Sequence, residues 1–323
     1  KIIKDMQITR DICTAGNAER QKANIPVRQP LTKLEIKNLD LRKEYIELIK
    51  EELNVKEVKE SKNLENEIEL DQNITPALRA EGEYREFMRE LQDQRKKLRL
   101  NPGDKMPLSI EMIYKKYKIL PIMQEHMIRV AAVAYLICDS MDVPVHKENI
   151  ITALLFHDMG NIIKVDFVNL LEVFEPEGIE YWKKIKDEYI TKYGKSEHTA
   201  TLKIIEELNL NKEVLSIVDW VDFPNMCKNL NSGNINSKIA QYSDMRAGPY
   251  GVLSYDERMA EAGKRYKDRK DNIFNSEERD KLVACGKEIE KQIFAKCKIK
   301  PEDINDETIV PIIAKLKNFV IPG

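Results

Sequence analysis

The spacing of apolar residues divides the chain into two parts. From residue 106 to the C-terminus, apolar residues recur every three or four positions, which places them on one face of a helix. We therefore expect this part to be almost entirely helical. The predicted helices span residues 109–117, 122–141, 147–157, 178–192, 198–209, 212–221, 236–246, 255–267, 276–297 and 308–317.

Residues 1–105 mix two periodicities. Helical spacing and polar–apolar alternation predict helices at 2–23, 43–53 and from 76 onward, and strands at 33–37, 55–58 and 67–70. Thr75-Pro76 is typical of a helix start, with Thr as the N-cap and Pro at the first helical position. Asn101-Pro102-Gly103-Asp104 ends that helix, and we place a domain boundary there. The predicted protein is mainly α, with a small α+β domain at residues 1–105 and an all-helical domain at residues 106–323.

Composition agrees with a soluble globular protein, since 42% of the residues are hydrophobic and 33% are charged. The sequence contains no run of about 18 apolar residues, so it predicts no membrane-spanning helix. The formal net charge of −2 gives no global reason to expect nucleic-acid binding. The chain begins at Lys1, with neither an initiator Met nor a signal-peptide pattern, which suggests a fragment of a longer protein.

The five cysteines are widely spaced, and no pair has metal-binding or CxxC spacing. They are Cys13, Cys138, Cys227, Cys285 and Cys297. Wide spacing and an odd number favour reduced thiols, and hence a cytoplasmic protein.

Three of the four histidines stand where a metal could use them. His126 lies on a predicted helix with an apolar face, and His157-Asp158 ends the apolar run Ile150–Phe156. Buried polar groups without partners cost several kcal/mol, so this pair needs a partner, and a divalent cation is one. Imidazole and carboxylate ligands suit Mn, Fe, Co, Ni or Zn, and Mg is a further candidate. A single His on an apolar helix is, however, more often a hydrogen-bonded core residue.

The order His, then His-Asp, then a distant Asp resembles the HD superfamily of metal-dependent phosphohydrolases. The matching segments are Glu125–Ala131, Phe156–Asn161 and Ala240–Asp244, within a resemblance that covers roughly residues 106–270. The resemblance implies an all-helical domain in which His126, His157, Asp158 and Asp244 bind a metal ion. It also implies hydrolysis of a nucleotide or another phosphate ester, with Asp158 as a catalytic residue that could bridge to a second ion.

The resemblance extends to three further residues. His198 stands where two-metal members of the superfamily place another His, so it is a possible ligand of a second ion. Arg129 could contact substrate phosphate, although an ion pair within the helices is equally plausible. Lys164 could replace the Lys that often follows the Gly of the family's His-Asp-x-Gly turn, where this chain has Asn161.

The chain also departs from the two-metal pattern. Residues 217–222 contain no His, although two-metal members often have one or two there, so we expect one ion rather than two. Asp219 and Asp222 could be ligands, but solvated carboxylates on a helix face are the more frequent case. These gaps also allow an inactive helical scaffold, for which no metal should be found in the purified protein.

Residues 1–105 resemble the C-terminal region of isoleucyl-tRNA synthetases. The matching segments are Ala23–Leu31, Ile49–Val58 and Thr75–Lys96, in the same order as in that family. The resemblance implies a module that assists tRNA binding. The basic residues Arg95, Lys96, Lys97 and Arg99 could contact RNA, but a solvated helix face explains them as well. The synthetase motifs His-Ile-Gly-His and Lys-Met-Ser-Lys-Ser are absent, so this chain alone cannot aminoacylate tRNA.

Two interpretations follow. In the first, the chain is a metal-dependent phosphohydrolase fused to a synthetase-derived module that could deliver tRNA. In the alternative, it is the C-terminal fragment of an isoleucyl-tRNA synthetase with an HD appendage. The reading frame upstream of Lys1 separates the two, and neither predicts an oligomeric state.

Overall fold

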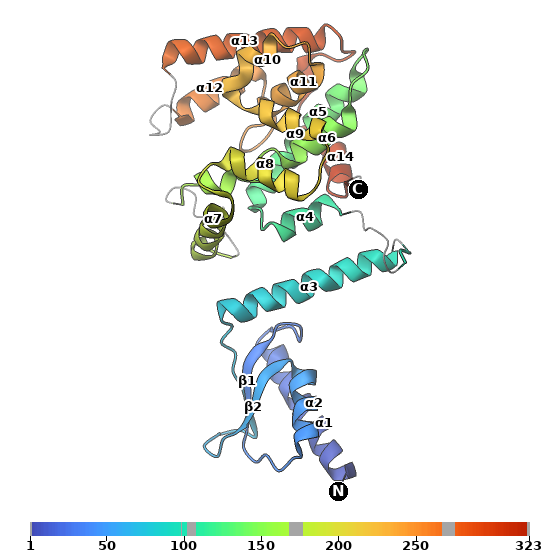
Figure 1. Ribbon diagram of the computed structural model, residues 1–323, viewed down its shortest axis with the longest axis vertical. Helices are drawn as coiled ribbons and strands as arrows, with labels where there is room; N and C mark the ends of the chain where they lie inside the picture. The colour runs from blue at the N-terminus through green and yellow to red at the C-terminus, as the bar shows by residue number, and fades with distance from the viewer. Residues whose placement is uncertain (1, 98, 102–107, 168–176, 267–274, 322–323) are drawn as a thin grey trace. The chain divides into compact units, whose positions relative to one another are not determined.

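A computed structural model of the protein describes residues 2–97, 99–101, 108–167, 177–266 and 275–321 (Figure 1). The contacts between Cα atoms divide the chain into two compact units, residues 1–106 and 107–323. The predicted boundary segment falls largely at residues 102–104, outside the described residues. The predicted mainly α class is confirmed, with helices in both units and one small sheet.

Unit 1 is built on a sheet of three strands in the order β2-β1-β3 (Figure 1). The strands β1 and β2 are parallel, β3 is antiparallel to β1, and helix α2 connects β1 to β2. Apolar side chains at alternate positions of β1 are buried, among them Leu34 and Ile36. The elements are α1 Ile2–Lys22, β1 Leu31–Ile36, α2 Lys43–Leu53, β2 Val55–Glu60, β3 Ile68–Leu70 and α3 Pro76–Lys97.

Helix α3 begins as the sequence predicts. The Thr75 hydroxyl accepts a hydrogen bond from the backbone N–H of Leu78, and Pro76 is the first helical residue. Only Leu78 and Gly82 of α3 are buried. Most of this helix is therefore in contact with solvent within unit 1, including Lys96 and Lys97 at its end.

Unit 2 is helical, and the predicted helices are confirmed to within a few residues at their ends. The helices are α4 Ile110–Lys116, α5 Pro121–Ser140, α6 Lys147–Phe156, η1 Asn161–Lys164, α7 Ile179–Tyr193, α8 Glu197–Glu207, α9 Lys212–Val221, η3 Phe223–Asn225, α10 Met226–Leu230, α11 Ile235–Asp244, α12 Tyr255–Tyr266, α13 Ser276–Phe294, η4 Pro301–Asp303 and α14 Asp306–Leu316.

Four helices form the centre of unit 2. Helices α5, α6, α9 and α11 pack against one another, and α14 covers α5. The seven residues Ile150–Phe156 of α6 are all buried, as expected for a helix surrounded by others. Helix α13 packs on α10 and α11, so the C-terminal helices contribute to the core of this unit.

The segment between the predicted helices 212–221 and 236–246 is not all loop. Residues 226–230 form the short helix α10, and the side chain of Asn229 is fully buried. Its amide nitrogen donates hydrogen bonds to the Ser237 carbonyl and to Gln241 Oε1. The burial of Asn229 is hard to predict from sequence. Its neighbours are rich in Asn, Ser and Gly, which is typical of a loop, and its hydrogen-bond partners lie on another helix.

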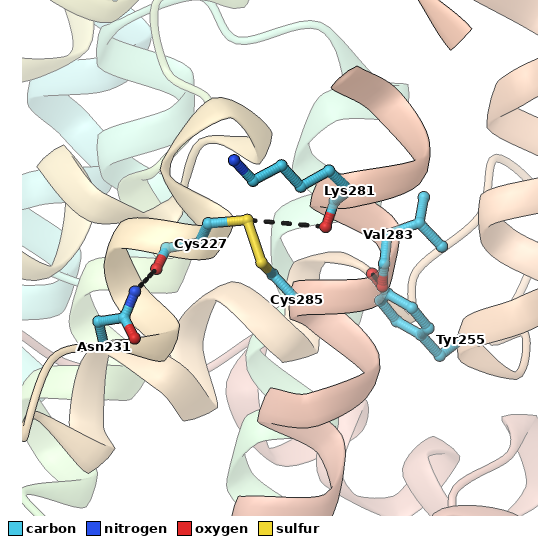
Figure 2. Close-up of a disulfide and its surroundings, with 6 residues drawn as sticks. All are labelled: Cys227, Asn231, Tyr255, Lys281, Val283 and Cys285. Atoms are coloured by element: carbon cyan, nitrogen blue, oxygen red, sulfur yellow. Dashed lines mark hydrogen bonds between the residues drawn. A yellow bond between two sulfur atoms is a disulfide. The ribbon is translucent and has the colours of Figure 1, made fainter. Parts of the chain in front are cut away.

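The prediction of five reduced cysteines is wrong for one pair. Cys227 of α10 and Cys285 of α13 form a disulfide that joins the two helices (Figure 2). The two positions are 58 residues apart, so their spacing in the sequence gave no sign of the pairing. Cys13, Cys138 and Cys297 are free. Cysteine usage therefore does not support the expectation of a reducing compartment. No helix in the described part of the chain is both long and apolar enough to span a bilayer.

Candidate metal centre

Three helices of unit 2 position the candidate ligands. His126 lies on α5, which begins with Pro121 at its first position, where a missing N–H costs nothing. His157 follows the last residue of the buried helix α6, and Asp244 is the last residue of α11. Because α5, α6 and α11 pack against one another, residues that are up to 118 positions apart meet in space.

The three side chains converge on one point. Nε2 of His126 lies 3.1 Å from Oδ1 of Asp244, and Nε2 of His157 lies 3.4 Å from the same oxygen. The imidazole rings are 5.4 Å apart between centroids. One donor atom from each residue lies within 4.8 Å of the other two. This is the compact arrangement of nitrogen and oxygen donors that a transition metal requires.

Packing and a hydrogen bond fix the orientation of His157. Its side chain is only 3% exposed, and Nδ1 donates to the backbone carbonyl of Leu154 at 2.8 Å. A carbonyl can only accept, so the proton lies on Nδ1 and the lone pair of a neutral ring lies on Nε2. That Nε2 atom is buried and has no hydrogen-bond partner among the described residues.

An unsatisfied buried nitrogen needs an explanation, because leaving it unpaired costs about 1–3 kcal/mol. A divalent cation between His126, His157 and Asp244 would accept the Nε2 lone pair and satisfy it. The backbone carbonyl behind Nδ1 is the kind of partner that commonly orients a ligating histidine. The residues present therefore fit a metal ion.

Charge around the site favours ionised forms. Burial alone would lower the pKa of His157, but Asp158 and Asp244 outweigh it and raise this pKa to about 9. Burial alone would raise the pKa of Asp244, but the nearby imidazoles of His126 and His157 hold it well below its usual value. The carboxylate of Asp244 is therefore ionised and available to a cation at neutral pH.

Asp158, the fourth predicted ligand, lies beside this group but outside the three converging atoms. Its Oδ2 is 3.7 Å from Nε2 of His126, and its Oδ1 is 3.8 Å from Nε2 of His157. The side chain is 25% exposed, so one face of the carboxylate is open to solvent. Beneath it, the buried hydroxyl of Tyr114 donates to the Leu155 carbonyl at 2.7 Å and supports the end of α6. The sequence pattern of α4 did not predict that Tyr114 would contact the end of α6.

Comparison with known families agrees with this geometry. Residues 123–242 match the family model of the HD domain. The HD match includes His126, His157 and Asp158 and ends two residues before Asp244. An HD domain implies a metal-dependent hydrolase in general. No curated protein and no solved structure matched the chain.

The turn after the HD residues packs tightly on α8. The N–H of Gly160 donates to the hydroxyl of Thr201. A Cβ atom at position 160 would lie 2.1 Å from the carbonyl oxygen of Glu197. Only glycine leaves room for the first turn of α8 at this distance. Lys164, predicted to contact phosphate, lies on η1 and is 3.7 Å from Glu197 Oε1.

Arg129 lies one helical turn after His126 on α5. Its Nη1 donates to the carbonyl of Gly248 at 3.1 Å, so it contacts the turn that follows Asp244. In the described part of the chain this guanidinium therefore contacts a backbone carbonyl, rather than forming the ion pair within the helices that the sequence left open. Arg258 of α12 donates to the neighbouring Ala247 carbonyl and so contacts the same turn.

His198, the predicted ligand of a second ion, forms a separate cluster with two carboxylates. Nε2 lies 3.0 Å from Oδ1 of Asp219, and Nδ1 lies 3.2 Å from Oδ2 of Asp222. The hydrogen bond to Asp222 outweighs burial and, with Asp219, raises the pKa of His198 to about 9. Both aspartate side chains are more than half exposed, as the sequence favoured, and both also pair with His198.

The predicted RNA-binding residues lie at the end of α3 in unit 1. Arg95, Lys96 and Lys97 are in the last turn of the helix, and Arg99 follows it with a left-handed backbone. Arg95 Nη2 donates to the Asn101 carbonyl, which makes it in part a cap of the helix end. The HD match does not reach this unit, so its resemblance to isoleucyl-tRNA synthetases stays a prediction.

Proposed function

We propose that unit 2 is a metal-dependent phosphohydrolase that acts on a nucleotide or another phosphate ester. The observation that carries this proposal is the convergence of His126, His157 and Asp244 around a buried Nε2 atom with no hydrogen-bond partner. When bound, a divalent ion would neutralise charge on phosphoryl oxygens and lower the pKa of a water molecule.

The residues of the chain have distinct roles in this proposal. His126, His157 and Asp244 hold the ion, with the Leu154 carbonyl fixing the ring of His157. Asp158 is the fourth ligand, and its open face allows it to orient the attacking water. Arg129 and Lys164 are the cationic side chains proposed to bind the phosphate, Arg129 through guanidinium N–H groups other than the one on Gly248.

One ion is proposed rather than two. Both ring nitrogens of His198 face carboxylate oxygens, an arrangement that suits an imidazolium because both nitrogens then donate. A second ion at His198 would have to disrupt at least one of these pairs. His198 as a ligand of a second ion is therefore the weaker alternative.

The test is a screen of phosphate esters with each of Mn, Fe, Co, Ni, Zn and Mg added to metal-free protein. The screen should include nucleoside mono-, di- and triphosphates and a generic ester such as p-nitrophenyl phosphate. The proposal expects metal-dependent turnover that Asp158→Ala lowers by about 100-fold or more. Asp256→Asn is the control, because Asp256 is an exposed aspartate that pairs with Lys287 and is not one of the proposed ligands. No turnover with any metal, or full activity in Asp158→Ala, would contradict the proposal.

A separate proposal concerns RNA. We propose that the exposed basic end of α3 contacts the backbone of tRNA, which would let unit 1 deliver a phosphate on RNA to unit 2. The exposure of Lys96, Lys97 and Arg99 supports this proposal. A binding assay with tRNA tests it, and the proposal fails if replacing these three residues by Gln leaves the affinity and its salt dependence unchanged.

A further inference from the structure

A cavity lies in unit 2, at the opposite end of α11 from Asp244. Its volume is about 240 Å³, and it opens between the first turn of α11 and the last turn of α13. The lining residues are Gly233, Ile235, Lys238, Gln292, Ala295 and Lys296. The lining holds two cations and no acidic residue.

Lys238 is the unusual member of this lining. The residue is only 7% exposed, although lysine is rarely buried without an ionic partner. Its Nζ donates to Gln292 Oε1 at 2.7 Å, which is a neutral acceptor. Among the described residues, no carboxylate oxygen lies within ion-pair distance of Nζ. A buried ammonium whose charge nothing balances is costly, and an anion in the cavity would remove that cost.

Lys296 adds a second positive charge on the other wall. It is exposed at the end of α13, and no ion pair of its side chain occurs in the described part of the chain. Burial lowers the pKa of Lys238, and the charge of Lys296 lowers it further, so the two ammonium groups repel each other across the cavity. An anion between them would reverse this repulsion.

The N-terminus of α11 adds only its dipole, because the N–H groups of Asn236 and Ser237 already donate to the Asn234 side chain. The helix dipole places partial positive charge at Ile235, which also lines the cavity. A lysine near the C-terminus of α13 could be buried there to bind the last carbonyls of that helix. Lys238 does not do so, because its Nζ donates to the side chain of Gln292 and to no carbonyl of α13. The last turn of α13 is instead closed by the N–H groups of Ala295 and Lys296.

We propose that this cavity is an anion site in which Lys238 and Lys296 bind a phosphate group. The volume is below the range of about 300–1,000 Å³ that is typical for drug-sized ligands, so the occupant is inorganic phosphate or a small phosphomonoester. Lys238 lies six residues before Asp244 on α11, roughly 9 Å along the helix axis. The site is therefore distinct from the metal centre and does not depend on the proposed hydrolysis.

The experiment is calorimetric titration of the metal-free protein of residues 1–323, because removing the metal disfavours phosphate binding at the metal centre. One arm uses inorganic phosphate and the other glycerol 3-phosphate, both at constant ionic strength. The variants are Lys238→Met, Lys296→Met and the control Lys291→Met. Lys291 is an exposed lysine on α13 that pairs with Glu288. Lys296→Met changes an exposed residue, so it tests the site even if Lys238→Met does not fold.

The proposal expects one saturable site in at least one arm, with a Kd of the order of 1 mM for inorganic phosphate. Lys238→Met and Lys296→Met should each weaken that binding by about tenfold or more, while Lys291→Met leaves it unchanged. Tighter binding of glycerol 3-phosphate would assign a phosphomonoester, and binding of inorganic phosphate alone would assign the free ion. The absence of saturable binding in both arms would overturn the proposal, and so would equal affinity in Lys296→Met and wild type.

Discussion

Nε2 of His126 lies 3.1 Å from Oδ1 of Asp244, although 118 positions separate the two residues along the chain. The contact requires α5 and α11 to pack with these two polar positions facing each other, although the buried residues of α5 are otherwise apolar. A fold that needs only a stable core gains little from placing two imidazoles and a carboxylate there. The pairing is therefore best explained by a ligand that all three side chains share.

Two arginines donate hydrogen bonds to the turn that follows Asp244, and they allow a matched comparison. Arg129 donates to Gly248 from α5, and Arg258 donates to Ala247 from α12. If Arg129 also binds substrate phosphate, Arg129→Gln should raise KM by about tenfold or more relative to Arg258→Gln. Both variants should lose similar stability on thermal unfolding. Equal effects on KM would show that Arg129 acts only by holding the turn.

Gly160→Ala should destabilise unit 2 by about 1–3 kcal/mol, because the added methyl group overlaps the Glu197 carbonyl and forces α8 away from the HD turn. Chemical denaturation of the metal-free protein measures the change. Gly233→Ala is the control, since no atom lies within 4 Å of a Cβ at that position, and its effect should stay within about 0.5 kcal/mol. A Gly160→Ala protein as stable as Gly233→Ala would mean that the close packing of α8 is not rigid.

The His198 cluster predicts how stability varies with pH. The folded pKa of about 9 lies above the ordinary value of 6.5, so the folded protein holds this proton more tightly. The stabilisation is therefore fully present below about pH 6.5 and is lost as the pH rises through about 9. Its size should be of the order of 1 kcal/mol, because the cluster is partly exposed to solvent.

The measurement is the difference in unfolding free energy between wild type and Asp222→Asn, taken without metal from pH 6 to pH 10. The difference should be largest at low pH and shrink toward pH 10. Asp256→Asn serves as the control for loss of a surface charge. A difference that grows with pH would contradict a protonated His198 in the folded state.

Reduction of the disulfide should destabilise unit 2. The Cys227–Cys285 bond closes a loop of 58 residues, for which the chain-entropy model gives about 4 kcal/mol. Thermal unfolding with and without a thiol reductant measures the effect, and the Cys227→Ser, Cys285→Ser double variant should match the reduced protein. The reductant should not affect the double variant. A wild-type melting temperature that the reductant leaves unchanged would mean that the bond does not form in solution.

Local features of the sequence predicted much of this structure. Apolar spacing located the main helices, and Thr75-Pro76 marked the start of α3, because both signals arise within a few neighbouring residues. The HD pattern pointed to His126, His157 and Asp244 before any contact was known. Features that depend on the packing of distant segments were not predictable. The Cys227–Cys285 bond, the pairing of His198 with two aspartates and the buried Lys238 are of this kind.

The convergence of three ligands is tested most directly by metal binding to the purified protein. Metal-free wild-type protein should bind about one equivalent of Mn, Co, Ni or Zn in a calorimetric titration. Asp244→Asn should weaken that binding by about 100-fold. Asp222→Asn, which alters the His198 cluster instead, should bind one equivalent as wild type does. Failure of the wild-type protein to bind any of these ions, or unchanged affinity in Asp244→Asn, would show that His126, His157 and Asp244 do not form a metal centre.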